Sequence, residues 1–148
     1  MQPRELAVTI VRAALGVLLI ATGALKIGHA NDLAAAIAGF RLLSPDIVAP
    51  LALVLPFAEA LLGIYLLLGL FTRIAAYVAS GAFVLYALAI ASAVVRHIPA
   101  NCGCFGPNDR AVADWPHVAF DLILAGAALV VALGAPGAFA LDRRITRT

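Results

Sequence analysis

Charged side chains are scarce in this chain, and their scarcity narrows the possible functions before any motif is considered. Of its 148 residues, 12% are charged and 7% aromatic, whereas 64% are hydrophobic. Soluble domains are about a quarter charged, so the composition excludes a water-soluble enzyme, a disordered segment and a nucleic-acid-binding protein. The formal net charge of +2 is too small to indicate an anionic partner. The sequence therefore predicts an integral protein of the lipid bilayer.

Four apolar runs are long enough to cross a membrane. They cover about residues 6–25, 47–71, 74–95 and 117–134, and a helix needs roughly 20 apolar residues to span about 30 Å of hydrocarbon. The length of the chain leaves room for one ordinary domain. We therefore expect a single all-α domain over residues 1–148, built as an integral membrane four-helix bundle.

The connections between these runs differ in character. Only Thr72 and Arg73 separate the second and third runs, which predicts a tight antiparallel hairpin of helices. Residues 32–40 form an amphipathic stretch, which favours a short interfacial helix. Residues 96–116 are rich in glycine and proline, which predicts an irregular loop.

The distribution of basic residues predicts the orientation. Arg143, Arg144 and Arg147 cluster just after the fourth run, and basic residues next to a span favour the cytoplasmic side. An even number of spans puts both termini on that side. We therefore expect a multi-pass plasma-membrane protein with cytoplasmic termini and an extracytoplasmic loop at 96–116.

Cysteine is rarer still than charged residues, and the two cysteines lie together in that loop. Cys102 and Cys104 are separated only by Gly103, and a disulfide that closes so small a ring is strained and readily exchanged. This favours a thiol-disulfide redox role. Two alternatives stay open: a soft-metal site for copper or zinc completed by His97 or His117, and cysteines that are only small apolar residues or a local staple.

Glu59 lies near the middle of the second run, where a charged group is costly and needs a partner. Arg12 is the predicted partner, because it enters the membrane from the opposite direction along the first run. The expected pair serves either as a structural ion pair or in a proton- or quinone-related role. Gly16, Gly23 and Gly63 are predicted to let helices pack closely.

Lys26 and Asp121 are expected near the depth of the cysteine loop, Lys26 at the end of the first run and Asp121 about one turn into the fourth. A nearby ammonium lowers the pKa of a thiol, and a carboxyl group can accept or return its proton. Both residues are therefore predicted to tune the thiols. The alternatives are that Lys26 reaches the lipid headgroups and that Asp121 caps or orients the fourth helix.

Three sequence segments resemble a known family. They are RAALGVLLIATGALK at 12–26, EALLGIYLLLGLFTR at 59–73 and NCGCFG at 101–106. The chain resembles the MauE-type methylamine utilisation membrane proteins, within the wider DoxX-like group of four-helix membrane proteins. The cysteine segment is the distinctive one.

The resemblance implies a role in maturing extracytoplasmic proteins, such as disulfide formation in a methylamine dehydrogenase subunit, together with a thioredoxin-like partner. The DoxX-like group adds quinone-linked electron transfer, and the chain is similar in outline to disulfide-forming enzymes of the vitamin K epoxide reductase kind. Those enzymes use two cysteine pairs, and this chain has one, so it needs a partner or a direct acceptor.

The expected function is therefore disulfide exchange through Cys102 and Cys104, with Cys102 attacking first and a membrane quinone near Glu59. A soft-metal binding or transport protein is the competing class. A non-catalytic subunit of a redox complex is a third possibility, and homodimer formation is left open.

Overall fold

The computed structural model describes residues 3–103, 106, 111–135, 137 and 139–142, and within them all regular structure is helical. The described helices run in the order α1 (Pro3–Lys26), α2 (Ala30–Gly39), α3 (Pro45–Leu68), α4 (Thr72–Val95) and α5 (Trp115–Gly134). Four of them, α1, α3, α4 and α5, are long and apolar enough to cross a membrane. The predicted all-α membrane fold is confirmed.

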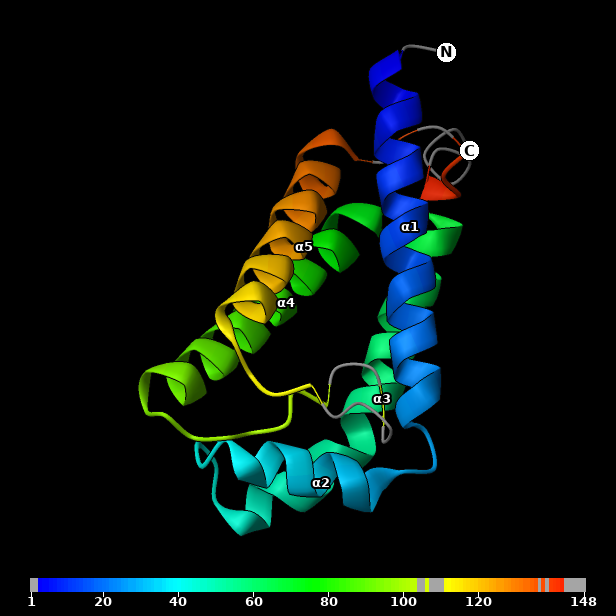
Figure 1. Ribbon diagram of the computed structural model, residues 1–148. Helices are drawn as coiled ribbons and strands as arrows, with labels where there is room; N and C mark the ends of the chain where they lie inside the picture. The colour runs from blue at the N-terminus through cyan, green and yellow to red at the C-terminus, as the bar shows by residue number, and fades with distance from the viewer. Residues whose placement is uncertain (1–2, 104–105, 107–110, 136, 138, 143–148) are drawn as a thin grey trace.

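The beginning of α1 and residues 101–103 lie at opposite ends of the described structure (Figure 1). The beginning of α1 and residues 139–142 share one end, hereafter the terminal end. Helix α2 and the segment that joins α4 to α5 close the other, hereafter the loop end. Helix α2 covers most of the amphipathic stretch predicted to be helical, and it links the loop ends of α1 and α3.

The membrane helices are arranged as two pairs. Helix α1 packs along α3 and α4 packs along α5, whereas α3 and α4 share much less contact. The turn from α3 to α4 is tight, as predicted, but it comprises residues 69–71, and Thr72 and Arg73 belong to α4. Gly69 adopts a left-handed conformation with φ of 70° and ends α3. Helices joined by this turn nevertheless diverge, so the predicted tight hairpin is a tight turn without extensive helix pairing (Figure 1).

Glycines bring α1 and α3 into backbone contact. A Cβ atom on Gly63 would lie 2.7 Å from the carbonyl oxygen of Gly16, and a Cβ atom on Gly23 would lie 2.7 Å from that of Pro56. Side chains do not tolerate such distances, so only glycine permits this approach. The close-packing role predicted for these three glycines is confirmed, and their contacts set the register of the pair.

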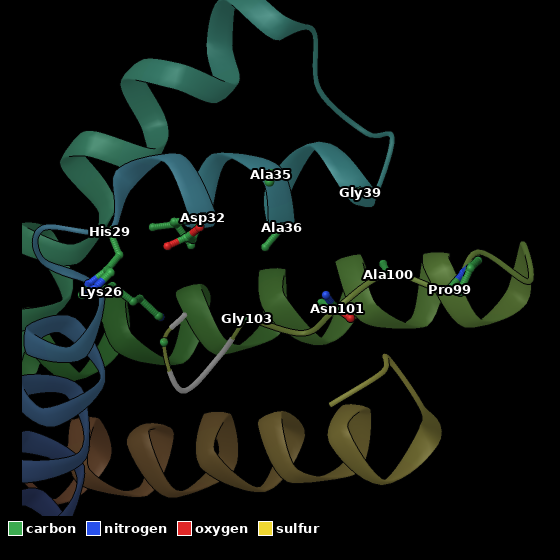
Figure 2. A pocket seen from close by; sticks show the side chains of 12 residues that line it. Lys26, His29, Asp32, Ala35, Ala36, Gly39, Pro99, Ala100, Asn101 and Gly103 are labelled. Atoms are coloured by element: carbon green, nitrogen blue, oxygen red, sulfur yellow. The ribbon is translucent and has the colours of Figure 1, made fainter. Parts of the chain in front are cut away.

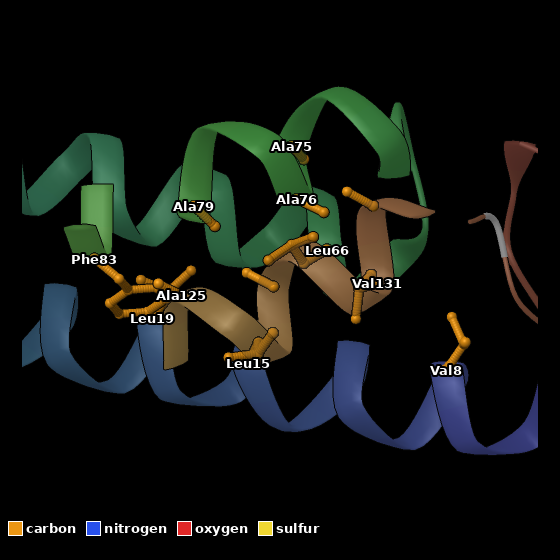
Figure 3. Close-up of a cluster of buried hydrophobic side chains, with 12 residues drawn as sticks. Val8, Leu15, Leu19, Leu66, Ala75, Ala76, Ala79, Phe83, Ala125 and Val131 are labelled. Atoms are coloured by element: carbon orange, nitrogen blue, oxygen red, sulfur yellow. The ribbon is translucent and has the colours of Figure 1, made fainter. Parts of the chain in front are cut away.

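A hydrophobic core joins the two pairs (Figure 3). Small residues of α4 (Ala75, Ala76 and Ala79) face larger side chains from the other helices, and all of these residues are buried. The larger members of the core are Val8, Leu15, Leu19, Leu66, Phe83 and Val131. Most of the other apolar side chains remain exposed on the outside of the bundle, as expected of a surface that faces lipid.

The terminal end is held by the C-terminal segment. The carboxylate of Asp142 accepts hydrogen bonds from the backbone N–H groups of Phe71 and Thr72, at 2.7 and 2.8 Å. The Asp142 N–H group donates to the carbonyl of Gly69 at 3.0 Å. Buried Arg12 lies close enough to Asp142 for a direct electrostatic interaction. Asp142 therefore caps the start of α4 and supplies an opposite charge for Arg12.

We predict that Gly63→Ala lowers the stability of the protein by about 1–3 kcal/mol, because the new methyl group collides with the backbone of α1. Gly81→Ala is the matched control, because Gly81 lies on α4 with nothing within 4 Å of its missing Cβ. Replacing this glycine should be neutral or stabilise the helix by up to about 1 kcal/mol. Reversible unfolding in detergent micelles measures both, and equal effects would contradict the packing described here.

Candidate functional site

Each of the four membrane helices contributes one polar side chain to a cluster in the interior. These are Lys26 from α1, Glu59 from α3, Tyr86 from α4 and Asp121 from α5. Lys26 and the two acidic residues are almost completely buried, with exposed fractions of 6% for Lys26, 5% for Glu59 and 6% for Asp121. We call these four residues the polar cluster. Polar groups at membrane depth are costly, and where they gather they mark functional sites.

An ion pair forms the centre of the polar cluster. The Lys26 ammonium donates to both carboxylate oxygens of Glu59, with Nζ at 3.0 Å from Oε1 and 2.8 Å from Oε2. The Tyr86 hydroxyl lies 2.6 Å from Glu59 Oε1, within hydrogen-bond distance. Glu59 therefore receives three contacts from two other helices, which compensates for the loss of water around its charge.

The prediction that Arg12 pairs with Glu59 is wrong. Helix packing sets an antiparallel register in which Gly23 lies opposite Pro56 and Ala60. Lys26 is only three positions beyond Gly23, about 4.5 Å along the axis, whereas Arg12 is eleven positions away in the other direction, about 16 Å. Arg12 is therefore held near the terminal end, and Lys26 takes the place predicted for it.

Tyr86 is the member of the polar cluster that sequence reasoning missed. The third apolar run, residues 74–95, has no charged residue that would mark a site. Of its two tyrosines, Tyr77 lies near the start of α4, whereas Tyr86 lies in the interior of the helix, where a hydroxyl group needs a hydrogen-bonding partner. The position of Tyr86 far from both helix ends was therefore the sequence feature that could have identified it.

Asp121 belongs to the polar cluster, but its Oδ2 atom does not take part in the hydrogen bonds described above. Its Oδ2 atom is buried and has no hydrogen-bond partner among the described residues. Lys26 and His117 interact with it electrostatically, and so does Tyr86. The structure thus brings Lys26 and Asp121 together, as their matched depth suggested. The tuning of the thiols predicted for both stays a prediction.

His117 connects this region to the surface at the loop end. It lies one turn before Asp121 on α5, so the two side chains share a helix face. Its ring Nδ1 is 2.5 Å from Asp114 Oδ1, and its backbone N–H donates to the same oxygen at 3.0 Å. These hydrogen bonds hold the pKa of the exposed Asp114 carboxyl below its ordinary value. Asp114 is thus the N-cap of α5.

The cysteine segment is packed against the loop end. Cys102 is disulfide-bonded, its side chain is buried, and its N–H donates to the carbonyl of Ala111 at 2.8 Å. The chain has one other cysteine, Cys104, which lies outside the described residues. Gly103 adopts a positive φ of 62° and faces Ala36 of α2 so closely that a Cβ would lie 3.0 Å from it. Helix α2 therefore supports the segment directly.

A cavity of about 390 Å³ lies between α2 and the cysteine segment (Figure 2). Lys26 lines it at the end of α1, together with His29 and Asp32 before and within α2, and Asn101 and Gly103 of the cysteine segment line the opposite wall. Lys26 thus contacts Glu59 within the bundle and also borders the space beside the cysteine segment. The cavity and the polar cluster form one continuous site.

The alternative prediction was a metal site, and the described residues do not supply a complete set of ligands for one. No group of three His, Cys, Asp or Glu side chains gathers there in a way that could hold a metal ion. His97 is exposed just after α4, and His117 is bound to Asp114. Cys104, a member of the predicted ligand set, is outside the described residues.

Comparison with known proteins places the chain in a family. The model of the family described as methylamine utilisation protein MauE matches residues 4–134. The chain belongs to the MauE family. The methylamine utilization protein MauE of Paracoccus denitrificans is 32% identical over 129 residues, which cover 86% of this chain and 69% of that relative. No solved structure matches the fold. The matched region contains the whole polar cluster and both cysteines.

We predict that Lys26→Met destabilises the protein by about 3–5 kcal/mol, because it leaves the Glu59 carboxylate buried without a cation. Adding Glu59→Gln to this variant should recover much of the loss. Arg73→Met removes an exposed cation and should change stability by no more than about 0.5 kcal/mol. Unfolding of the three variants in detergent measures these effects, and a double variant less stable than Lys26→Met would contradict the pairing.

We also predict an acid-dependent contribution from Asp114. Because the pKa of Asp114 is lowered by folding, its stabilising effect is complete above the pKa of an unfolded carboxyl and is lost as pH falls through the lowered value. Wild type should therefore unfold at a higher temperature than Asp114→Ala at neutral pH, and the difference should vanish in acid. Asp46→Asn, at the exposed start of α3, serves as the control.

Proposed function

We propose that this protein is a membrane thiol-disulfide redox protein, in which the disulfide of Cys102 accepts electrons from the dithiol of a thioredoxin-like extracytoplasmic protein. Cys104 is the second cysteine of the proposed pair. The loop end would face the extracytoplasmic side of the plasma membrane, with both termini in the cytoplasm. The pathway supported is the maturation of extracytoplasmic proteins, with methylamine utilisation as the setting suggested by the family.

The observation that carries the proposal is the position of Cys102. It is disulfide-bonded, and the adjacent Gly103 lines a cavity whose other wall includes Lys26. An ammonium group stabilises a thiolate, which is both the attacking and the leaving form of a thiol. A disulfide that served only as a staple would have no use for a cavity bordered by a buried cation.

Electron flow through one cysteine pair requires an acceptor beyond the protein partner. Oxidation of a dithiol to a disulfide releases two electrons and two protons, which reduce one quinone to a quinol. We therefore propose a membrane quinone as the acceptor. The apolar bundle exposes its outer surface to lipid, where such a quinone dissolves, and the polar cluster offers groups that can carry the protons.

We predict that the purified protein in lipid nanodiscs oxidises a reduced thioredoxin-like protein, and that the Cys102→Ser and Cys104→Ser variants do not. Without quinone, one equivalent of partner should be oxidised per chain; with a membrane quinone, turnover should continue. Gel-shift labelling of the partner thiols measures both. For the reverse direction, attack by Cys102 predicts that Cys104→Ser forms a mixed disulfide with an oxidised thioredoxin-like protein, releasing one partner thiolate, and that Cys102→Ser does not.

A different experimental result would contradict each part of the proposal. Full function in a host strain after replacement of both cysteines by serine would identify a non-catalytic subunit. Multiple turnover without quinone would remove the quinone. Free thiols in the protein as isolated from cells, protected from labelling by Cu(I) or Zn²⁺, would replace the redox role with soft-metal binding.

A further inference from the structure

Two carboxyl groups and one ammonium share the polar cluster, and this imbalance has a chemical consequence. Lys26 is bonded through both Glu59 oxygens and compensates that charge. Asp121 is equally buried, yet its Oδ2 lacks a hydrogen-bond partner among the described residues. An ionised carboxylate in such a site would be poorly solvated, although Lys26 and His117 act on it electrostatically. Burial without a hydrogen bond therefore favours the protonated form of Asp121.

Asp121 interacts electrostatically with two sets of groups. On one side are Tyr86, Glu59 and Lys26, joined to one another by the contacts of 2.6 to 3.0 Å described above. Lys26 lines the cavity beside the cysteine segment. On the other side is His117, whose side chain is 25% exposed at the loop end and is bound to Asp114. Asp121 thus lies between the cavity and the surface.

We propose that Asp121 is the internal proton donor for disulfide exchange, giving its proton through Tyr86, Glu59 and Lys26 to the thiolate released in the cavity and regaining it from the surface through His117. This inference rests on the proposed function for its thiol chemistry. Asp121 acts through other residues and is a positioning and proton-storing group.

The exchange step balances as follows. A thiolate of the reductant attacks one sulfur of the Cys102 disulfide, a new sulfur–sulfur bond forms, and the old one breaks with its electron pair on the released sulfur. Lys26 gives a proton to this thiolate. The ionised Glu59 then accepts the hydroxyl proton of Tyr86 and passes a proton on to Lys26. Tyr86 takes the proton of Asp121, which becomes a carboxylate until His117 returns a proton from solution.

Infrared spectroscopy of the intact protein in nanodiscs tests the resting state directly. The oxidised protein should show the carbonyl stretching band of a neutral carboxyl group in a dry environment, and ¹³C-labelled aspartate should shift this band, which distinguishes Asp121 from Glu59. Asp121→Asn should remove the band, and Asp46→Asn should leave it unchanged. Oxidised protein without an aspartate-dependent band would overturn the proposal, and the labelling result stands even if Asp121→Asn does not fold.

Reduction of the disulfide by dithiothreitol tests the coupling without any protein partner. The neutral carboxyl band should change as the disulfide opens, and Asp121→Asn should slow reduction by up to about a hundredfold at neutral pH, the low end of general acid effects. The defect should shrink in acid, where solution supplies the proton. An unchanged band together with unchanged reduction kinetics would overturn the coupling, whereas failure with a thioredoxin-like protein alone would count only against the proposed function.

Discussion

The Lys26–Glu59 ion pair is the interaction on which the rest of the arrangement depends. A carboxylate in the middle of a membrane helix costs about 2.5–3.5 kcal/mol even on the mildest scale, and here Lys26 and Tyr86 share its stabilisation. Meeting that requirement brings α1, α3 and α4 to one point. The same point lies under the cavity at the loop end, so the interaction that holds the helices together also places a cation beside the cysteine segment.

Glycine packing makes this ion pair possible. Contact between Gly16 and Gly63 and between Gly23 and Pro56 brings two backbones together and leaves one register for α1 against α3. In that register Lys26 reaches Glu59, and Arg12 is directed to Asp142 at the terminal end. Small residues at a helix interface thus decide which of two cations meets a given carboxylate.

This dependence explains which features could be predicted from sequence. Apolar runs identify four membrane helices because span length is a property of each helix alone. The need of Glu59 for a partner was evident for the same reason. The identity of this partner could not be predicted, because the choice between Arg12 and Lys26 depends on the register between two helices. The role of Tyr86 could not be predicted from sequence, because its hydroxyl group acquires a hydrogen-bonding role only when the fold places Glu59 opposite it.

The unequal packing of the two helix pairs has a mechanical consequence. At the terminal end they are joined by the buried core and by Asp142, and toward the loop end they diverge (Figure 1). A rotation of one pair against the other about the terminal end would therefore displace the loop end most. Over a helix of 24 residues, about 36 Å long, a rotation of about 5° moves the far end by about 3 Å, roughly the width of one sulfur atom. Slight rocking of one pair against the other is therefore enough to change the width of the cavity beside Gly103.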